Sequence, residues 1–599
     1  MIEKKDNIWI FTFEYAGIIK VGGLGEVPAN QAKHLANNYD ITVFIPSNGQ
    51  LQILEKNLEL EKLPFNCVGQ INPSQLGINE PEATYNISFY RLRINNVKIV
   101  LLHGENPFTN RFLNDKIVYN PDTLSGKICL FSIGMRCYID FLIDNRKQDL
   151  PDIIHIHDYH AVIPFIGIKQ ILTKNGLDVA SIITIHLLTW PRYGIDFYRI
   201  CGIDYTPISI HLKDGIKQLT LKEIFSFCEK ISGQYQPPSV EQIGAFISDL
   251  VTTVSQSYLK SDIIPNCGNE LIEFKTNFVW DGCDWDYEEI FQQVLRNHEY
   301  EIRDVFHIPF GKSLTLSDMK KYLLTHKLSH LDQSPLIQSE KVLAVINEIS
   351  NGNEFVKNGY IKAFEESGPL VLTTGRISPQ KGFETILEAI PMVIKVIPNA
   401  KFLFLTLPTD YSLNEIRTYA QYVKTYSNNL RIIFGVAKDI YHLAHIASDV
   451  YCALSRWEPF GIIALEAMST RLPVIATKVG GFQESIIDIR NFPEIGTGIL
   501  VEKDNPSQFA GALISLLKLK EISEKVKNKD AIYETENFRL VNQIPDKILE
   551  SLVLLDPNYY NKIKENCYKR VEQNFRWSIV SKKLIELYSM IKKLRLSNL

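Results

Sequence analysis

The sequence predicts an α/β protein made of two Rossmann-like domains, each with a doubly wound parallel sheet. Three features indicate this. Short apolar runs, most of them β-branched, alternate with helix-length segments in the first half of the chain, and the same alternation returns after residue 368. The stretch between the two halves lacks this pattern. Continuous apolar strands separated by helices are typical of parallel sheets that are covered on both faces.

The first domain is expected to span residues 1–286. Its predicted strands lie at 9–13, 41–45, 97–102, 153–156, 182–185 and 250–254. A helix is predicted over 26–37, after a glycine-rich segment that follows the first strand. In folds of this kind ligands bind beyond the carboxyl ends of the strands, so the loops there are the candidates for function.

The second domain is expected to span residues 369–570, with predicted strands at 370–374, 401–406, 431–434, 449–454, 473–477 and 498–501. Apolar side chains at every third or fourth position predict a helix over 382–396. The stretch 287–368 is interpreted as a linker or insertion, and 518–545 as a second, charge-rich insertion. Residues 571–599 are expected to form a C-terminal helix, for which a return to the N-terminal domain is one option.

Charge and composition exclude several classes of function. The chain has 64 Lys and Arg against 68 Asp and Glu, a formal net charge of −4, and therefore no overall basic footprint for nucleic acid or an anionic membrane. Neither a signal peptide nor a membrane-spanning apolar run is recognisable. We expect a cytoplasmic protein with no nucleic-acid and no membrane partner. The nine cysteines contain no C-x-x-C pair, and reduced thiols are expected.

A glycine-rich loop, K-V-G-G-L-G at residues 20–25, follows the first predicted strand and leads into a helix. Glycines let backbone N–H groups approach a ligand closely, and a helix N-terminus favours an anion. Lys20 adds a positive charge, so the loop could hold a phosphate. The alternative is a plain turn before a helix, because the segment is neither G-x-G-x-x-G nor a Walker sequence.

Three histidines and an aspartate end the strand at 153–156, in the sequence H-I-H-D-Y-H at residues 155–160. Asp158 and His160 suit the hydroxyl groups of a sugar, since carboxylate and imidazole both form hydrogen bonds with hydroxyls. Zinc is the alternative, but no cysteine lies nearby and no H-E-x-x-H motif is present. No metal and no cofactor are therefore expected. His186 ends the next predicted strand, where a structural role competes with a catalytic one.

Two cations follow the first strand of the second domain. Arg376 comes directly after the strand, and Lys381 opens a helix five residues later. A guanidinium, an ammonium and a helix N-terminus together would bind a diphosphate. The alternative is a pair of solvated cations beside a loop.

The most specific signal is a pair of glutamates, Glu458 and Glu466, separated by eight positions in the sequence E-P-F-G-I-I-A-L-E. At 3.6 residues per helical turn, this spacing would place them on nearly the same side. Carboxylates accept hydrogen bonds from the vicinal hydroxyls of a ribose or a hexose. The loop at 478–482 follows the next strand and is expected to close the site. An amphipathic helix with one exposed glutamate is the alternative.

Taken together, these motifs resemble the glycogen and starch synthases, which are retaining glycosyltransferases of the GT-B fold. The segments that carry the resemblance are K-x-G-G-L at 20–24, H-D-Y-H at 157–160 for the family's H-D-W-H, T-I-H at 184–186 for its T-V-H, T-T-V-S at 252–255 for its T-V-S, D-G-C-D at 281–284 for its N-G-I-D, and the nucleotide-sugar half at 376–466. The resemblance runs from Glu14 to the last helix, apart from the two insertions. It implies a GT-B fold whose two domains face a deep cleft.

Carried over residue by residue, the resemblance implies roles in binding the donor. Arg376 and Lys381 would hold the diphosphate and stabilise the leaving nucleotide. Lys20 and the backbone of Gly22 and Gly23 would approach the distal phosphate and the donor sugar from the opposite domain.

The resemblance also implies roles around the sugar. Glu458 would contact the transferred glucose and Glu466 the ribose. Asp158 and His186 would face the donor glucose, with His186 near its reactive carbon. The resulting catalytic candidates are Lys20, Asp158, His186, Arg376, Lys381 and Glu458.

The chain departs from the family pattern at three positions. Glu26 stands where bacterial members have Asp, Leu187 where many have Asn, and Phe460 where they have Gly or Cys. None of these changes removes a charged catalytic group. Phe460 and Gly461 are expected to line the nucleotide-sugar site.

The leading hypothesis is a glucan synthase that transfers glucose from ADP-glucose or UDP-glucose to the non-reducing end of an α-1,4-glucan, with retention of configuration. A relative with a small sugar or sugar-phosphate acceptor is the runner-up, although K-x-G-G-L belongs to the glucan synthases. A glycoside hydrolase using Glu458 and Asp158 would leave the two cations without a purpose. A non-catalytic glucan-binding protein would have no need to keep the donor-site charges.

Overall fold

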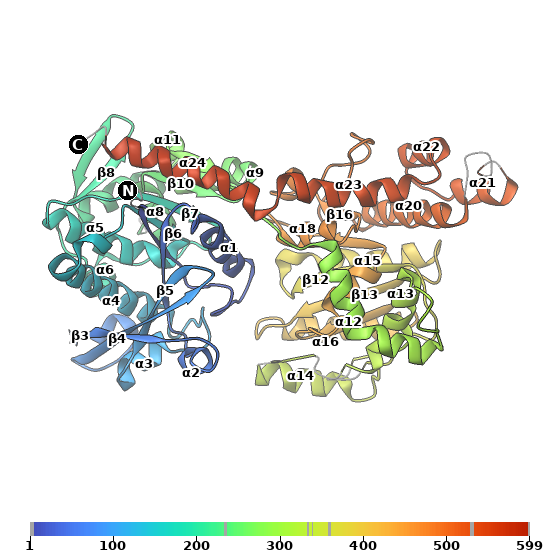
Figure 1. Ribbon diagram of the computed structural model, residues 1–599, viewed down its shortest axis with the longest axis horizontal. Helices are drawn as coiled ribbons and strands as arrows, with labels where there is room; N and C mark the ends of the chain where they lie inside the picture. The colour runs from blue at the N-terminus through green and yellow to red at the C-terminus, as the bar shows by residue number, and fades with distance from the viewer. Residues whose placement is uncertain are drawn as a thin grey trace. The chain divides into compact units, whose positions relative to one another are not determined.

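The computed structural model forms two units, Met1–Gly282 with Trp577–Leu599, and Cys283–Arg576 (Figure 1). The structure describes residues 5–232, 237–331, 335–337, 339–356, 361–526, 532 and 534–596. Parts of the two expected insertions, at 332–334, 338, 357–360, 527–531 and 533, lie outside the described residues. Each unit is built on a mainly parallel sheet, which confirms the predicted α/β class.

The sheet of the first unit has nine strands among the described residues, in the order β11-β10-β7-β6-β1-β2-β5-β4-β3. All six strands predicted from apolar runs are present. The strands are β1 (Asn7–Phe11), β2 (Asp40–Pro46), β3 (Glu61–Ile71), β4 (Ala83–Ile94), β5 (Val97–Gly104), β6 (Ile153–His157), β7 (Ala180–Ile185), β10 (Leu250–Thr253) and β11 (Thr276–Phe278).

The long strands β3 and β4 at one edge of this sheet are absent from the prediction. They pair antiparallel with each other, and β4 pairs antiparallel with β5. Buried and exposed positions mix along both strands. Strands that face water on one side lack the continuous apolar runs by which buried parallel strands are recognised.

Helices cover both faces of the first sheet and bury a separate core on each face (Figure 1). Alternate side chains of β1 supply the two cores, Trp9 and Phe11 on one face and Ile8 and Ile10 on the other, because successive side chains of a strand point to opposite faces. The helices of this unit are α1 (Glu26–Leu35), α2 (Leu51–Leu54), α3 (Pro107–Leu113), α4 (Leu124–Asn145), α5 (Val162–Lys174), α6 (Ile195–Ile200), α7 (Leu221–Ser232), α8 (Val240–Ile247), α9 (Gln256–Tyr258), α10 (Ile264–Cys267), α11 (Glu270–Glu273) and α24 (Trp577–Leu596), with a hairpin of β8 (Ile208–Leu212) and β9 (Gly215–Leu219).

The C-terminal helix α24 belongs to the first unit. It packs against α1 and β7, and Leu584, Leu587, Tyr588 and Ile591 join the core under α1. The last helix of the chain thus contributes to the core of the first unit.

One expectation about the cysteines is wrong. Cys67 of β3 and Cys137 of α4 form a disulfide, with Cα atoms 5.9 Å apart, whereas reduced thiols were expected throughout. The other seven cysteines are free and buried. The two partners are 70 positions apart, so the pair is produced by the fold and has no spacing signature in the sequence.

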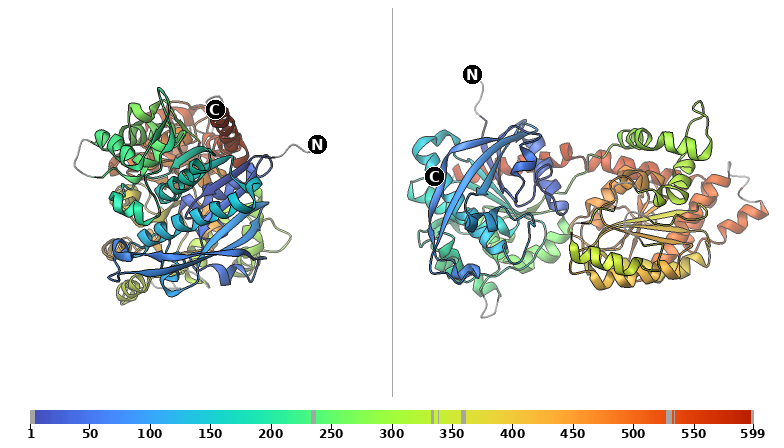
Figure 2. Two further views of the ribbon diagram at one scale, coloured as in Figure 1. Left: turned by 90° about the vertical axis from the view of Figure 1, so that its left-hand side faces the viewer. Right: turned by 90° about the horizontal axis from the view of Figure 1, so that it is seen from below.

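The sheet of the second unit has six parallel strands among the described residues, in the order β14-β13-β12-β15-β16-β17. Numbered within the unit, this is the order 3-2-1-4-5-6 of a Rossmann sheet. Helices lie on both faces of it (Figure 2). The strands are β12 (Leu370–Arg376), β13 (Lys401–Leu407), β14 (Leu430–Phe434), β15 (Val450–Ala453), β16 (Val474–Thr477) and β17 (Gly498–Val501).

The stretch 287–368, interpreted as a linker or insertion, is largely helical and belongs to the second unit. Within it, α13 packs on α17 and α14 packs on α16, so its amphipathic helices cover the Rossmann sheet's own helices. The helices of the unit are α12 (Tyr287–Phe306), α13 (Leu316–Thr325), α14 (Glu340–Ser350), α15 (Phe383–Ile394), α16 (Leu413–Thr425), α17 (Tyr441–Ala447), α18 (Ile462–Ser469), α19 (Phe482–Ser485), α20 (Pro506–Lys525), α21 (Thr535–Val541), α22 (Lys547–Leu555) and α23 (Tyr559–Asn574).

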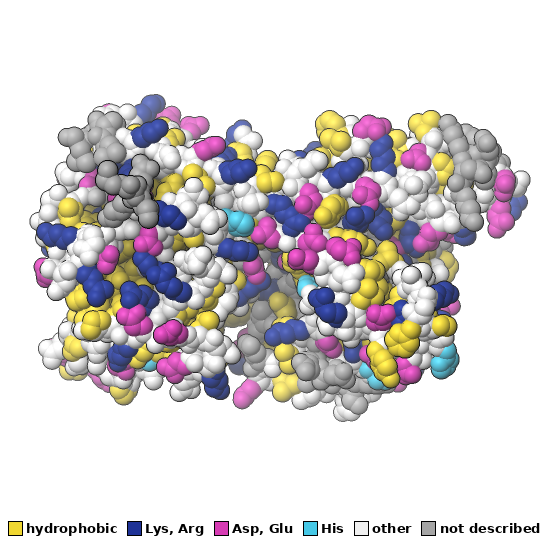
Figure 3. Space-filling view, viewed as in Figure 1, with side chains coloured by type: hydrophobic (Ala, Val, Ile, Leu, Met, Phe, Trp, Pro, Cys, Tyr) yellow, Lys and Arg dark blue, Asp and Glu magenta, His cyan; other side chains and the backbone are white. Residues whose placement is uncertain are grey.

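The surface carries charges of both signs. Figure 3 shows Lys and Arg side chains interspersed with Asp and Glu side chains on the visible face, as the net charge of −4 leads one to expect. In the part of the chain that the structure describes, no helix combines the length and apolar character needed to cross a membrane.

Candidate functional site

The predicted site residues follow the strands that flank the point where each sheet reverses its strand order, here called the switch point. In the first unit β1 lies between β6 and β2, and the loops after β1 and β6 carry the glycine loop and Asp158. In the second unit β12 lies between β13 and β15, and the loops after β12 and β15 carry Lys381 and Glu458. Ligands of open α/β sheets bind at such points, outside the carboxyl ends of the strands.

At the switch point of the second unit, Lys381 and Glu458 form an ion pair. Lys381 Nζ lies 2.6 Å from Glu458 Oε2, and the two side chains are only 15% and 10% exposed. The Ser455 hydroxyl donates to the same carboxylate oxygen at 2.9 Å. Two residues 77 positions apart, singled out separately from the sequence, are thus brought into direct contact.

Glycines let three loops close around Glu458. Gly382 has φ +61°, and a Cβ there would lie 2.1 Å from the carbonyl oxygen of Leu454. Gly480 has φ +43°, and its Cβ would lie 1.8 Å from the carbonyl oxygen of Glu458. No side chain fits at such distances, so these positions require glycine if the loop is to keep its place. Gly461, with φ +93°, begins α18.

Arg376 ends β12 with its side chain exposed, and it takes part in none of the ion pairs among the described residues. Glu466 lies on α18 and accepts a hydrogen bond from the Tyr441 hydroxyl at 3.0 Å. Glu458 lies in the loop before α18, which begins at Ile462, and Glu466 lies on the helix itself. The two glutamates have different partners.

Phe460 is buried, with 1% of its surface exposed, and its ring packs against that of Phe575 with centroids 5.8 Å apart. Its side chain therefore belongs to the core. Phe460 was expected to line the nucleotide-sugar site, but only its backbone remains available for that.

In the first unit, the buried carboxylate of Glu14 holds the glycine loop. Glu14 Oε2 accepts from the backbone N–H groups of Val21 and Gly22, at 2.6 and 2.9 Å, and Oε1 accepts from the Tyr119 hydroxyl at 2.6 Å. The Gly22 N–H is therefore engaged within the protein. Space beside Gly22 is open, since a Cβ there would meet no atom within 4 Å.

Sequence reasoning did not propose Glu14 as a site residue. A signal for it exists, because Glu14 interrupts the apolar segment that begins the chain. A carboxylate that closely follows a buried strand needs hydrogen-bond donors, and the loop N–H groups supply them.

Lys20 forms an ion pair with Glu26 at 2.5 Å, and the two side chains are 46% and 34% exposed. Glu26 is the residue at which the chain departs from the Asp of bacterial relatives. The ammonium that was expected to approach a phosphate is thus paired with a neighbour of its own loop and is accessible to solvent.

A hydrogen-bonded chain connects α24 to the end of β7. Thr252 Oγ1 donates to the Ile183 carbonyl at 3.2 Å, so Thr184 Oγ1 donates to Thr252 at 2.7 Å. Thr184 must then accept from His155 Nε2, at 2.7 Å. His155 is therefore protonated on Nε2, and its Nδ1 accepts from the Tyr588 hydroxyl at 2.8 Å.

The hydrogen bond between His157 and His186 shows which ring nitrogen of His186 carries its proton. The rings of His155 and His157 stack with centroids 4.2 Å apart, and His157 Nδ1 lies 2.9 Å from His186 Nε2. Among the described residues, His157 Nε2 has no hydrogen-bond partner. An orphaned buried N–H is rarer than an orphaned acceptor, so His157 donates from Nδ1 and His186 keeps its own proton on Nδ1.

Burial keeps the polar groups of this region uncharged. It lowers the pKa of His155, His160 and His186 to about 3 each, and it raises the pKa of Asp158 to about 8, so the Asp158 carboxyl is protonated at neutral pH. Asp158 has φ +58°, and its Oδ1 accepts from the backbone N–H of His186 at 2.7 Å. Non-glycine residues adopt such a conformation rarely, and often at functional sites.

His160 stacks on Phe13, with centroids 5.0 Å apart, and its Nδ1 has no hydrogen-bond partner among the described residues. The structure thus brings Asp158 and His186 together and keeps His160 within the same buried region. No cluster of three or more His, Cys, Asp or Glu side chains suited to a metal ion occurs in the part of the chain that was searched, the described residues.

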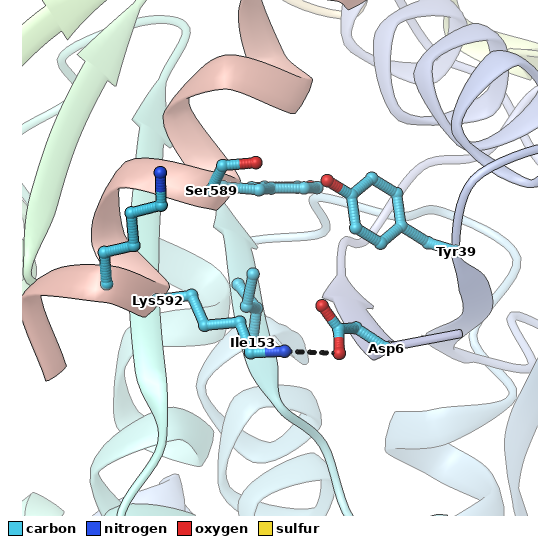
Figure 4. A pocket seen from close by; sticks show the side chains of 7 residues that line it. Asp6, Tyr39, Ile153, Ser589 and Lys592 are labelled. Carbon is cyan, nitrogen blue, oxygen red and sulfur yellow. Dashed lines mark hydrogen bonds and ion pairs between the residues drawn. The ribbon is translucent and has the colours of Figure 1, made fainter. Parts of the chain in front are cut away.

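A cavity of about 190 Å³ lies at the other end of β6, beside its first residue (Figure 4). Its lining residues are Asp6, Tyr39, Ile153, Tyr588, Ser589, Lys592 and Lys593. Lys592 pairs with Asp6 at 2.5 Å across it. The predicted site residues do not line this cavity, but the Tyr588 hydroxyl, through His155, connects its wall to the histidines.

Each half of the chain matches the model of a known protein family. Residues 7–273 match the starch synthase catalytic domain family, and residues 360–531 match glycosyl transferases group 1. The glycogen synthase of Protochlamydia amoebophila is 22% identical over 495 residues, 80% of this chain and 84% of that protein. The glycogen synthase of Hydrogenobaculum sp. is 23% identical over 81% of this chain and 84% of that protein.

Solved structures are similar over nearly the whole chain. The catalytic domain of starch synthase IV from Arabidopsis thaliana, bound to ADP and acarbose, has a TM-score of 0.65 at 17% identity. The match covers 99% of this chain and 100% of that chain. Sucrose-phosphate synthase from Thermosynechococcus elongatus has a TM-score of 0.50 at 16% identity, with 98% of this chain and 99% of that chain covered. The two Rossmann-like units and these likenesses define a glycosyltransferase of the GT-B fold. Within that class, the chain is similar to the glycogen and starch synthases, whose catalytic domain family matches residues 7–273.

Proposed function

We propose that this chain is a glycogen synthase, which transfers glucose from ADP-glucose or UDP-glucose to the non-reducing end of an α-1,4-glucan with retention of configuration. The observation that carries the proposal is the Lys381–Glu458 pair at the Rossmann switch point, 2.6 Å apart and largely buried. The solved relative with ADP bound supports a nucleoside diphosphate as part of the donor.

The second unit would neutralise the leaving group. A departing diphosphate needs cations that are already in position, because a preorganised charge requires no reorganisation when the bond breaks. Lys381 is held by Glu458, and Arg376, at the end of β12 and five positions before Lys381, is exposed. Arg376 would bind two phosphate oxygens at once, and Lys381 would act as a point charge.

The first unit would hold the transferred glucose with neutral groups. Asp158, protonated at neutral pH, and His186, with a proton on Nδ1, can each donate to a sugar hydroxyl. Such groups bind a sugar without competing for the cations that the diphosphate needs. Glu458, in the second unit, would contact the same glucose.

In the proposed reaction the bond between the glucose anomeric carbon and the diphosphate oxygen breaks, and a bond from that carbon to an acceptor hydroxyl oxygen forms on the same face. The acceptor proton passes to the oxygen of the departing diphosphate. Retention by this route needs no nucleophile from the protein.

Transfer of labelled glucose tests the proposal. The full chain is incubated with ADP-glucose or UDP-glucose and with glycogen, with maltose, or with no acceptor. We expect label in the polymer, and the ratio between the two donors identifies the preferred base. Label confined to a small soluble product would replace the glucan acceptor by a small sugar. No product and no donor binding would overturn the proposal.

A further inference from the structure

The loop that follows His186 is held unusually firmly. The Leu188 N–H donates to the Tyr258 hydroxyl at 3.0 Å. The N–H groups of Thr189 and Trp190 both donate to Glu241 Oε1, each at 3.0 Å, and the Thr189 hydroxyl donates to the same oxygen at 3.2 Å. Backbone groups of a surface loop are ordinarily satisfied by water, so this loop has a defined conformation built by side chains.

The loop is held by the carboxylate of Glu241, and burying a carboxylate costs free energy. Glu241 lies in the first turn of α8 and is completely buried. Its other oxygen, Oε2, has no hydrogen-bond partner among the described residues. Burying a carboxylate costs free energy unless its oxygens are hydrogen-bonded, and here the loop supplies the donors to Oε1.

The conformation that results is strained at Trp190. Its φ is +62°, in the left-handed region that bulky side chains avoid. The residues on either side are fixed as well, because the Val240 N–H donates to the Pro191 carbonyl at 2.9 Å. Strained residues of this kind cluster where a ligand is held.

The strained residue presents a large aromatic ring at the surface. Trp190 is 39% exposed, whereas His186, four positions earlier in the same loop, is only 9% exposed. Four residues span at most about 14 Å. The loop therefore leads from the buried histidine at the end of β7 to a solvent-exposed indole on a hydrogen-bonded backbone, within the length of a short oligosaccharide.

An indole in this position suits a sugar ring. The C–H groups of a pyranose carry partial positive charge, and the face of an aromatic ring carries the complementary negative charge. A platform whose conformation is fixed in advance loses little entropy on binding. A polymer whose reacting end is buried has further rings that extend outwards, and these need a surface contact.

We propose that Trp190 is a stacking platform for a glucose ring of the α-glucan acceptor, and that Glu241 is the positioning residue that holds it. This inference rests on the proposed function and identifies where its acceptor binds. The donor sugar is the less suitable occupant, because its hydroxyls are matched by the buried polar groups of Asp158 and His186.

The test compares Trp190→Asn with Trp190→Phe. Asn adopts positive φ more readily than Trp, so the first variant removes the ring while relieving the strain, and a loss of binding is not attributable to a misfolded loop. Phe keeps an aromatic face. Tyr205→Ala is the matched control, since it removes another exposed aromatic ring of the same unit, 52% exposed, from a residue with ordinary backbone angles.

Three quantities are measured for each variant: the KM for glycogen and maltoheptaose, the retardation of the protein in gels that contain glycogen with no donor present, and the Kd for ADP. We expect Trp190→Asn to raise the glucan KM and weaken retardation by about tenfold, a typical value for the loss of one stacked ring. Trp190→Phe should stay within about threefold. The Kd for ADP, measured by calorimetry, should not change.

A double-mutant cycle tests the role of Glu241. Glu241→Gln should raise the glucan KM when Trp190 is present and have little further effect in the Trp190→Asn background, because the two act through one contact. A purely structural role would produce equal effects in both backgrounds and would overturn the assignment of Glu241.

Failure of the platform and failure of the proposed function are distinguishable. An active wild type whose glucan KM is the same in Trp190→Asn overturns the platform and leaves the glycogen synthase function standing. A wild type that transfers no glucose overturns the function. In that case the retardation assay still tests the platform, because it needs no donor. Retardation of the wild type that is lost in Trp190→Asn supports the platform, and a wild type that glycogen does not retard rejects it.

Discussion

The second unit places an ion pair at its switch point, whereas the first unit places the buried, uncharged groups of Asp158 and His186 at its own. Lys381 and Glu458 form an ion pair at the switch point of the second sheet, and Arg376 is exposed at the end of β12. Around the switch point of the first sheet, the pKa of His186 is lowered to about 3 and that of Asp158 is raised to about 8. The difference fits the proposed donor, whose diphosphate is charged and whose sugar is not.

The two half-sites, meaning the groups at the switch point of each sheet, are also positioned by different parts of the chain. Glycines with positive φ allow backbone to close on the Glu458 loop, so the charged half-site is positioned by main chain. The neutral half-site is positioned by side chains, through a chain of hydrogen bonds and one ring stack from Tyr588 to His186. We therefore expect substitutions in the first unit to act through geometry and those in the second through charge.

The largest effect is expected from Lys381→Ala. It removes a preorganised cation and leaves the buried Glu458 carboxylate uncompensated, so kcat/KM should fall by about 10³-fold. Initial rates of glucose transfer measure this, and circular dichroism confirms the fold. Arg417→Ala is the control, because it removes an exposed cation of the same unit that is paired with Glu348. An equal effect of the two substitutions would remove the special role of Lys381.

A smaller effect is expected from His157→Leu, which removes the donor to His186 Nε2. The proton of His186 would no longer be confined to Nδ1, and kcat should fall by about tenfold while the Kd for ADP stays the same. His157→Asn places an amide N–H near the position of Nδ1 and should restore part of the loss. If Leu and Asn behave alike, the hydrogen bond to His186 has no part in catalysis.

Asp158→Asn should be tolerated better than Asp158→Ala, because Asn imitates the protonated carboxyl. Activity at pH 7 should remain within about tenfold of wild type for Asn. Stability provides the sharper readout. The folded pKa of about 8 lies above the reference value of 3.8, so the contribution of Asp158 to stability is present below the lower value and is lost as the pH rises towards 8.

The free energy of unfolding of wild type and Asp158→Asn, measured by urea denaturation at pH 5, 7 and 9, tests this sign. Wild type should lose stability relative to the variant as the pH rises. Parallel curves for the two proteins would show that Asp158 is not held neutral by the fold.

The smallest effect is expected from Tyr588→Phe. It removes the donor to His155 Nδ1 and leaves a buried acceptor unpaired, at a cost of about 1–3 kcal/mol in the free energy of unfolding. Glucose transfer should change by no more than about threefold, because two further residues separate Tyr588 from His186. Tyr39→Phe, which alters the same cavity from its other wall, should cost less, and the reverse order would contradict the proposed chain of hydrogen bonds.

The sequence predicted the parallel core of both units because buried strands carry continuous apolar runs. It did not predict β3 and β4, whose exposed faces interrupt such runs. Lys381 and Glu458 were recognised from their motifs, and their contact depends on backbone approaches at Gly382 and Gly480 that no spacing rule describes. The chain from Tyr588 to His155 joins residues 433 positions apart, and long-range contacts of this kind leave no local pattern.

The most direct test of the comparison between the two units is calorimetric titration of ADP into wild type, Lys381→Ala and His186→Ala. If charge in the second unit holds the diphosphate and neutral groups in the first unit act on the sugar, Lys381→Ala weakens ADP binding by about tenfold or more. His186→Ala should bind ADP as wild type does, although it transfers glucose more slowly. Unchanged ADP affinity in Lys381→Ala, or weakened affinity in His186→Ala, would contradict this division of roles.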